Sequence, residues 1–386
     1  MITEEILKDI VEMLDIFGPV TLEEMSGIRL MNRTDTKYLL PLETLAVLLH
    51  YAAADYRVQE VAGERNIVYH TVYLDTVDKA MYRAHQNGRA VREKIRVRTY
   101  VASQLTFLEV KNKNNKGRTD KRRIRITALD ELSAEGVDDF LSLYAWYKLP
   151  QLSPQLENRF QRITLVNRAM TERLTIDTDI CFRNLVNGNY AALPRLAVVE
   201  LKRDGRTSSP IRDILSRLHV HPAGFSKYCM GCVLTDENLK QNRFKPKVRK
   251  MRRAEIPRNI ETLIKAFIQF NSKKREHKLV LVWSNPPKSI LNLCQKNIEN
   301  SDIIFLKYIS DKDLVSVYNG ATATFFPTRY EGFGFPILES FACNTPVVTC
   351  RNTSLPEVGG NIALYTDEDG VDEMSYYMEL FENENF

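Results

Sequence analysis

Charged and apolar residues alternate along several short segments in the first two thirds of the chain, most clearly at Lys94–Tyr100 and Thr106–Lys113. Successive side chains of a β-strand point to opposite faces, so the cations of the first segment share one face and its two branched apolar residues share the other. In the second segment, Glu109 and Lys111 lie together, with apolar residues on the opposite face. The pattern predicts paired strands that have one packed face and one densely cationic face.

The same alternation recurs at five further places. Strands with a charged face are expected at Met31–Pro41, Arg118–Thr127, Asn158–Thr164, Arg173–Ile180 and Val198–Lys202. A single strand of this kind is typical of a solvated surface, but so many of them indicate a common lining. An antiparallel sheet that closes on itself with these faces inward would enclose a basic lumen, which repels itself unless anions occupy it.

Phosphate chains suit such a lumen best, because Arg forks and Lys ammonium groups match phosphoryl oxygens. Glu109 and Glu200 would hold a divalent metal that bridges the phosphates. Together these groups would perform phosphoryl transfer by positioning and charge neutralisation.

After Arg253 the pattern changes to alternating helices and strands. Asn259–Lys273 has apolar residues at helical spacing, and Lys278–Ser284 is a nearly continuous apolar run of the kind found in buried parallel strands. Further helices and strands alternate as far as Tyr365, as in half of a Rossmann-type sheet. The fold class expected for the whole chain is therefore α+β: an antiparallel β-tunnel followed by an α/β Rossmann-like half domain.

Length and charge refine this picture. The 386 residues favour two domains, and 44% hydrophobic and 27% charged residues are normal for globular protein. Eight Lys and Arg residues with no acid lie between Lys240 and Arg253, and they exceed the net charge of +5, so the basic balance does not indicate a nucleic-acid partner. We expect domains at residues 1–240 and 257–386, joined by a basic linker at 241–256. The linker is interpreted as a solvated connector, with contact to a phosphate chain that leaves the lumen or to an acidic membrane surface as alternatives.

The sequence shows no apolar run of membrane-spanning length and no basic, apolar start typical of a signal peptide, so a cytoplasmic protein without transmembrane segments is expected. Cys229 and Cys232 form a lone C-x-x-C pair without a second pair to complete a zinc site, and are interpreted as structural.

Seven motifs, in order over about residues 20–240, resemble the VTC domain, the polyphosphate polymerase domain of the vacuolar transporter chaperone family within the CYTH-like triphosphate tunnel metalloenzymes. They are Arg33–Tyr38, Lys94–Arg98, Glu109–Lys111, Phe160–Arg162, Arg173–Asp177, Val199–Lys202 and Ser226–Tyr228. The resemblance implies transfer of the γ-phosphate of ATP to a growing polyphosphate chain, with Mn²⁺ or Mg²⁺. Phe160 stands where the family often has Tyr. The Glu-x-Glu-x-Lys signature of the related triphosphatases and cyclases is absent, which favours the polymerase branch.

The resemblance also implies residue roles. The residues expected to bind the triphosphate or the growing chain during catalysis are Lys37, Arg96, Arg98, Lys111, Arg162 and Lys227. Glu200 is the expected metal ligand, and Lys202 is its basic catalytic neighbour. Further substrate contacts are expected from Arg33, Lys94, Glu109, Arg123 and Arg173.

The second segment resembles the donor-nucleotide half of GT-B glycosyltransferases of group 1 (GT4 type) over about residues 257–368, through Glu331–Glu339 and Ser354–Val358. Gly332 and Gly334 permit close backbone approach, and the helix that begins near Pro336 offers free N–H groups to a diphosphate. The residues expected to bind a nucleotide sugar are Arg258, Glu331, Gly332, Gly334 and Glu339. Asn344 replaces a usual Gly.

Sugar transfer requires a second domain that completes the cleft, so a nucleotide-sugar-binding remnant or a fusion of neighbouring genes is expected here instead of an active transferase. Two alternatives stay open for the first domain. It is a tunnel triphosphatase, or it is a binding module that senses polyphosphate or a nucleotide sugar without turnover.

Overall fold

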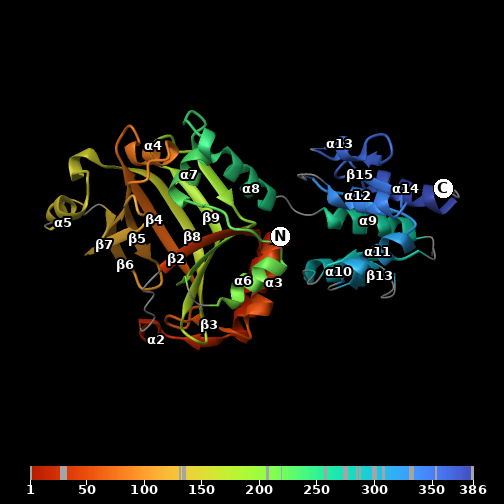
Figure 1. Ribbon diagram of the computed structural model, residues 1–386, viewed down its shortest axis with the longest axis horizontal. Coiled ribbons are helices and arrows are strands. Elements are labelled where there is room, and N and C mark those ends of the chain that lie inside the picture. Colours follow the sequence, from red (N-terminus) through yellow and green to blue (C-terminus); the bar gives the residue numbers. More distant parts are fainter. Residues whose placement is uncertain are drawn as a thin grey trace. The chain divides into compact units, whose positions relative to one another are not determined.

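The computed structural model describes residues 2–26, 33–129, 132, 136–205, 208–218, 220–255, 259–272, 277–283, 286, 288–297, 302–306, 309–329, 334–352 and 354–383. The chain divides into two compact units (Figure 1). The N-terminal unit is Ile10–Glu255, and the C-terminal unit comprises residues 256–386 with residues 1–9. None of the described helices combines the length and the apolar character that crossing a membrane would require.

An 11-stranded sheet forms the body of the N-terminal unit, and its main path runs β2-β11-β9-β8-β4-β5-β6-β7. The path strands are β2 (Arg33–Pro41), β4 (Asn66–Asp75), β5 (Arg92–Tyr100), β6 (Leu105–Lys113), β7 (Thr119–Ile126), β8 (Ser153–Asn167), β9 (Glu172–Asn184) and β11 (Leu196–Asp204). The short strands β1 (Gly18–Val20), β3 (Tyr56–Gln59) and β10 (Tyr190–Leu193) pair at its margins. Neighbours along the main path are antiparallel, as predicted. No ladder joins β2 to β7 among the described residues, so the sheet curves without closing through these two strands.

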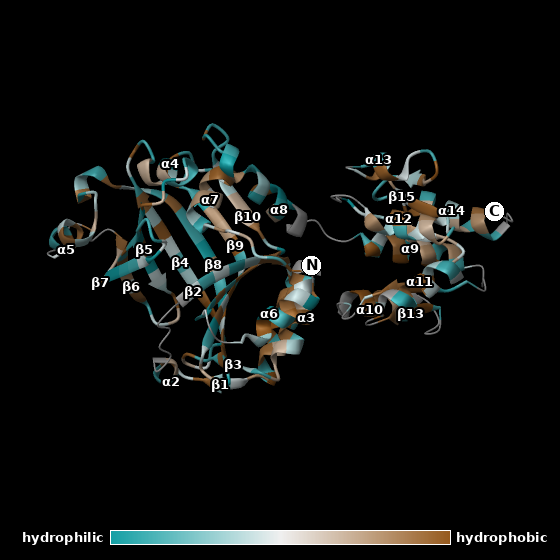
Figure 2. Cartoon of the chain, in the orientation of Figure 1, coloured by the Kyte–Doolittle hydropathy of each residue, from teal (hydrophilic) through white to brown (hydrophobic). Residues whose placement is uncertain are grey.

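Helices cover the outer, apolar face of this sheet. Ile95, Val97 and Val110 pack with Phe140 and Leu141 of α5 (Val137–Tyr144), as the alternation predicts. Helix α3 (Leu42–Ala52) contacts β2, β11 and α6 (Pro210–Arg217). The remaining helices before α7 are α1 (Ile2–Met13), η1 (Leu14–Ile16), α2 (Leu22–Ser26), α4 (Ala80–Gln86) and η3 (Leu149–Gln151). Hydrophilic and hydrophobic residues alternate along the strands (Figure 2), which leaves the charged side chains on the opposite face, here called the inner face.

Helix α7 (Lys227–Thr235) packs directly against the apolar part of the inner face. Gly231 allows this approach, because an added Cβ would lie 2.4 Å from Leu156 Cδ2 and 2.5 Å from Phe182 Cδ1. Nearly all of α7 is buried, including Cys229 and Cys232. Residues Lys227 and Tyr228, which the sequence placed at the end of a series of strand motifs, therefore begin a helix.

The segment interpreted as a basic linker belongs to the N-terminal unit as far as Glu255. It forms η4 (Asn242–Phe244) and α8 (Lys245–Glu255), and Phe244 and Met251 are buried in the same core as α7. Phe244, Val248 and Met251 follow helical spacing. These apolar positions explain why a segment rich in cations packs instead of extending into solvent.

The C-terminal unit alternates helices and parallel strands, as predicted. Its strands form two ladders: β12 (Leu279–Val282) with β13 (Ile303–Leu306), and β14 (Thr324–Phe326) with β15 (Val347–Cys350) and β16 (Leu364–Thr366). Its helices are α9 (Ile260–Asn271), α10 (Lys288–Asn297), α11 (Asp311–Gly320), α12 (Phe335–Ala342), α13 (Leu355–Gly359) and α14 (Val371–Asn383). Asn344 adopts φ +55, a left-handed conformation that suits the position where the family has Gly.

Candidate functional site

The inner face carries a continuous belt of charged residues, because the register of the sheet places them side by side. Directly paired residues across neighbouring strands are Lys37 with Glu200, Glu200 with Thr175, Lys202 with Arg173, Arg162 with Asp177, Arg96 with Glu109, and Lys94 with Lys111. Lys227 joins the belt from the first turn of α7. Most residues expected from the VTC resemblance therefore share this face.

The belt curves around a common centre. Lys111 on β6 lies five strands along the path from β11, yet Glu200 and Lys37 influence its pKa. Lys94 Nζ donates a hydrogen bond to Ser226 Oγ at 3.0 Å, and Lys37 Nζ donates to the Phe225 carbonyl at 3.0 Å. The end strand β2 and the distant strand β5 thus converge on the residues that precede α7.

Glu200 lies between two lysines. Its Oε1 is 3.5 Å from Lys37 Nζ, and its Oε2 is 3.0 Å from Lys202 Nζ. Burial raises the pKa of this carboxyl, but Lys37, Lys202 and Arg162 together hold it well below its usual range. Glu200 is therefore a carboxylate at neutral pH.

Asp177 is the second carboxylate of the belt, and it pairs with two cations. Arg162 donates two hydrogen bonds to it, to Oδ1 at 2.6 Å and to Oδ2 at 2.8 Å, and Lys227 forms an ion pair with the same Oδ2. Lys227 Nζ also lies 4.0 Å from the centre of the Phe160 ring, which stacks on Tyr69. Arg162 and Lys227 thus make cation–π contacts with the aromatic rings next to them.

Glu109, the third carboxylate, is buried between Arg96 at 2.6 Å and Lys121 at 2.5 Å. Burial raises its pKa, but Arg96, Arg98 and Lys121 outweigh burial and lower it to about 2. Its oxygens are therefore engaged by two protein cations, as those of Glu200 are, and its part in holding a metal stays a prediction.

Lys94, Arg98 and Lys111 are inner-face cations that make no ion pair with any carboxylate in the described part of the chain. Arg98 donates to Thr71 Oγ1 at 3.3 Å and lies over the Tyr69 ring. Lys94 and Lys111 face each other directly across β5 and β6, and like charges in this position are destabilising. Burial and the neighbouring cations Arg96, Lys37 and Lys94 lower the pKa of Lys111 to about 7, although Glu200 raises it.

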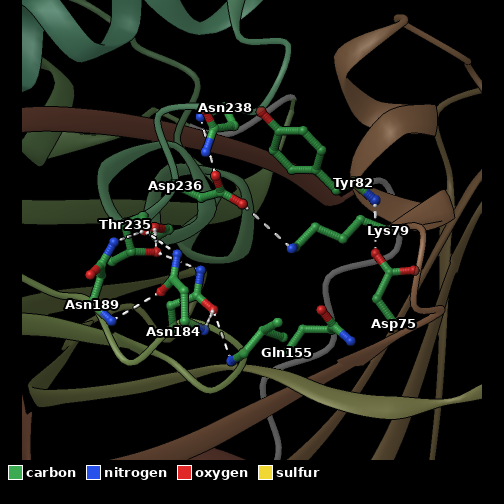
Figure 3. Close-up of polar contacts among 12 residues, drawn as sticks. Asp75, Lys79, Tyr82, Gln155, Asn184, Asn189, Thr235, Asp236 and Asn238 are labelled. Atoms are coloured by element: carbon green, nitrogen blue, oxygen red, sulfur yellow. Dashed lines mark hydrogen bonds and ion pairs between the residues drawn. The ribbon is translucent and has the colours of Figure 1, made fainter.

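A polar network fixes α7, and so positions Lys227 (Figure 3). At the C-terminal end of the helix, Asn189 Nδ2 donates to the Thr235 carbonyl at 3.0 Å, and Lys79 pairs with Asp236 at 3.6 Å. Asp75 accepts hydrogen bonds from the first backbone N–H groups of α4 at 3.0 Å, and from Tyr228 Oη at 2.6 Å. The helix is therefore held at both ends.

A metal at the inner face would be held by Glu200. Within the described residues, no three side chains of His, Cys, Asp or Glu gather as a set of metal ligands. Mg²⁺ commonly uses one or two carboxylates together with substrate phosphates. Glu200 fits this mode, since it is ionised, half-buried and surrounded by groups that attract phosphate.

Arg123 lies directly opposite Glu109 in the β6–β7 register, so it shares the inner face. It is exposed on the edge strand β7, where it stacks on Phe107 at 4.5 Å. The side chain of Arg33, and Arg258, Glu331 and Gly332, lie outside the described residues.

In the C-terminal unit, Gly334 caps α12 with φ +85. The exposed Glu339 accepts a hydrogen bond from Tyr318 Oη at 3.0 Å. These are the two predicted nucleotide-sugar residues whose positions the structure describes.

Sequence reasoning also missed or misplaced some residues. Asp177 and Lys121 were seen as members of charged faces, but their pairing with Arg162 and Glu109 depends on cross-strand register. Asp179 was expected on the face of Asp177, and this is wrong: its backbone adopts φ +47 and its side chain is exposed. The register of β8 and β9 shifts at this point, as in a β-bulge. As a result, the Ile180 side chain points into the core that packs against α7.

Comparison with known families agrees with this architecture. The VTC domain model matches residues 32–235, and the model of glycosyl transferases group 1 matches residues 235–382. The chain belongs to the VTC domain family, and a group 1 glycosyltransferase domain follows the VTC domain.

Individual relatives match the second domain. The O-antigen chain mannosyltransferase B of Escherichia coli is 33% identical over 127 residues, which cover 32% of this chain and 33% of that protein. The MMP alpha-(1->4)-mannosyltransferase of Mycolicibacterium hassiacum is 26% identical over 156 residues, which cover 40% of this chain and 38% of that protein. The chain thus spans about a third of the length of these relatives. Among solved structures, TarM aligns with a TM-score of 0.31 and 9% identity, covering 80% of this chain and 76% of that chain.

Proposed function

We propose that the N-terminal unit is a metal-dependent polyphosphate polymerase that transfers the γ-phosphate of ATP to the end of a polyphosphate chain at the inner face. The observation that carries the proposal is the convergence of cations from β2, β5, β6, β8, β11 and α7 on one curved face, with only a few carboxylates among them. Such a face is electrostatically costly without an anion. A triphosphate and a growing chain supply the required negative charge.

In the proposed reaction, a terminal oxygen of the polyphosphate chain attacks the γ-phosphorus of ATP. The bond between the γ-phosphorus and the β,γ-bridging oxygen breaks, ADP leaves, and the chain gains one phosphoryl group. Lys94, Arg98 and Lys111 bind phosphoryl oxygens without first giving up a carboxylate. Arg162 and Lys227, held in place by Asp177, line the opposite wall and orient the chain.

A divalent metal such as Mn²⁺ or Mg²⁺, held by Glu200 and phosphate oxygens, would neutralise charge that develops on the transferred group. Lys202 and Lys37 fix the Glu200 carboxylate in its position. The Thr175 hydroxyl, buried next to Glu200 and without a hydrogen-bond partner among the described residues, is available to a phosphoryl oxygen.

The test uses the purified full chain with ATP and Mn²⁺, and measures polyphosphate by gel electrophoresis. We expect chain growth that falls by about 100-fold in a Lys111→Met variant, because one preorganised charge contact is lost from a buried site. Arg159→Met is the matched control, since Arg159 is an exposed cation on β8, and its activity should equal that of the natural protein. A folded protein that forms no polyphosphate would refute the proposal, and release of free phosphate without chain growth would identify a triphosphatase.

For the C-terminal unit we propose nucleotide-sugar binding. The match to group 1 glycosyl transferases and the similarity to mannosyltransferases support a nucleoside-diphosphate sugar as the ligand. Gly334, in the left-handed conformation, opens the N-terminus of α12, where a diphosphate would be favoured. Calorimetric titration of a nucleoside-diphosphate mannose should show binding that weakens at least tenfold in a Glu339→Ala variant; binding that is equal in both proteins would contradict the role of Glu339.

A further inference from the structure

A second group of cations lies next to α7, at the margin of the inner face. It consists of Arg92 at the start of β5, Arg243 in η4 and Lys247 in α8, and is called the α8 cluster here. Both η4 and α8 lie beyond the residues that match the VTC domain, and Arg92, which lies within the match, precedes the Lys94–Arg98 motif. The α8 cluster is therefore not part of the motifs on which the proposed function depends.

The surrounding structure holds these cations in place. Phe244 packs against Tyr82 and His85 of α4 with ring centres 5.8 and 5.6 Å apart, and Tyr82 Oη donates to the Lys240 carbonyl at 3.0 Å. Consequently, Arg243 lies against Gly88, where an added Cβ would be 2.5 Å from a guanidinium nitrogen. Lys247 Nζ would be 3.0 Å from a Cβ at Gly224, two residues before the N-cap of α7.

The cluster has little compensating negative charge. Within the described residues, Arg92, Arg243 and Lys247 form no ion pair with a carboxylate. Burial and the cations Arg243, Arg92 and Lys37 lower the pKa of Lys247, with only Cys229 raising it. Burial, together with Lys94, Arg92, Lys247 and Arg243, lowers the pKa of His85 to about 2, so this histidine is neutral and adds no charge.

The cluster is also electrostatically continuous with the inner face. Arg92 lies two residues before Lys94 on the same face of β5. Lys94 contacts Ser226, and Lys247 lies against Gly224 two residues earlier in the chain. Cations thus extend from Lys37, past Lys94, to Arg92 and Lys247. A linear polyanion is the ligand that would neutralise such an extended row, because it carries charge at regular intervals.

We propose that the α8 cluster is a second phosphoryl-binding site, which holds the part of a polyphosphate chain that extends beyond the inner face. This inference rests on the proposed function for the identity of the polymer. A short triphosphate occupies the inner face alone, whereas a long chain contacts both sites. The α8 cluster therefore makes the protein discriminate between long and short chains.

The experiment compares long-chain polyphosphate with tripolyphosphate, each titrated calorimetrically into the full-length protein at several salt concentrations. The test variant is Arg243→Gln with Lys247→Gln. Its affinity for long chains should fall about tenfold, and the slope of log affinity against log salt should decrease by about 1.5, since two charge contacts are removed. Its affinity for tripolyphosphate should stay within twofold of the natural protein.

Two further variants separate the site from general charge effects. Lys245→Gln with Arg249→Gln removes two exposed cations that lie on the opposite side of α8 from Lys247, and it should retain long-chain affinity. Arg243→Lys with Lys247→Arg preserves both charges and should restore binding. Equal thermal midpoints would show that all variants fold.

Equal long-chain affinity in the test variant and the natural protein would overturn the inference, as would an equal loss in the Lys245 and Arg249 variant. Binding to phosphatidylserine vesicles that depends on Arg243 and Lys247, with no effect on long chains, would assign the cluster to a membrane surface instead. Because preformed polymer is used, the outcome is independent of synthesis. A protein that makes no polyphosphate would refute the proposed function but not this site.

Discussion

Triphosphate binding should be coupled to proton uptake at Lys111. Burial, together with Arg96, Lys37 and Lys94, lowers the pKa of this lysine to about 7 in the ligand-free protein. At pH 8 about nine tenths of it is then neutral, and a bound phosphate would return it to the charged form. We therefore expect uptake of about 0.9 proton per ligand from this residue at pH 8, decreasing to about 0.1 at pH 6.

The sign of the pH dependence follows from this uptake. An anion raises the pKa of a neighbouring lysine, so affinity should decrease as pH rises above about 7. The contribution of Lys111 approaches tenfold, or about 1.4 kcal/mol, for each pH unit between pH 8 and 9. The affinities are best compared with those of a matched variant over that range, because ionisation of the phosphate groups of the ligand contributes equally to both proteins.

The assay is calorimetric titration of tripolyphosphate at pH 8 in two buffers of different ionisation enthalpy, which yields the number of protons taken up. Lys111→Arg is the matched variant, because a guanidinium stays charged at this pH. Its uptake should be lower than that of the natural protein by about 0.9 proton. Lys94 and Lys121, whose pKa values burial lowers to about 8, contribute to both proteins and largely cancel. Equal uptake in the two proteins would refute the reasoning.

Two further predictions concern stability. Asp177→Asn should lower the free energy of unfolding by about 3 kcal/mol, because it leaves Arg162 and its neighbouring lysine buried without their carboxylate; urea denaturation measures this, and added tripolyphosphate should restore part of the loss. The exposed Asp179→Asn serves as control and should change stability by less than about 0.5 kcal/mol. Gly231→Ala should cost about 1–3 kcal/mol, since its Cβ would overlap two side chains of the inner face. Gly18→Ala, whose Cβ would meet its neighbour at an ordinary 3.9 Å, should leave the melting temperature unchanged.

The strands of the N-terminal unit could be predicted because half-buried strands have a strict period of two. At Lys94–Tyr100 the observed strand begins two residues earlier than predicted, and every side chain lies on the expected face. The belt of inner-face cations followed from the same period. Its ion pairs did not, because they depend on which strands are neighbours: Arg162 meets Asp177 through the β8–β9 register, 15 residues apart in sequence.

The helices around α7 could not be predicted in the same way. The residues of α7 itself are almost all buried. The segment Tyr228–Val233 therefore lacks the regularly spaced polar residues by which an amphipathic helix is recognised. The cations of η4 and α8 dominate the segment, but Phe244, Val248 and Met251 follow helical spacing among them. These three apolar residues are the signal in the sequence that indicates a packed helix.

Three carboxylates of the inner face, Glu109, Asp177 and Glu200, divide its cations into two groups, and this division indicates where a phosphate binds first. Glu109, Asp177 and Glu200 each pair with two cations, which must loosen those contacts before they can bind a ligand fully. Lys94 and Lys111, directly opposed on β5 and β6, have no such partner among the described residues, and their mutual repulsion persists until an anion lies between them. A phosphate that binds between these two lysines relieves their repulsion. A phosphate that binds to Arg162 instead replaces the Asp177 carboxylate, so one anion is exchanged for another. The wall formed by β5 and β6 should therefore dominate affinity, and the wall formed by β8, β9 and α7 should chiefly orient the bound chain.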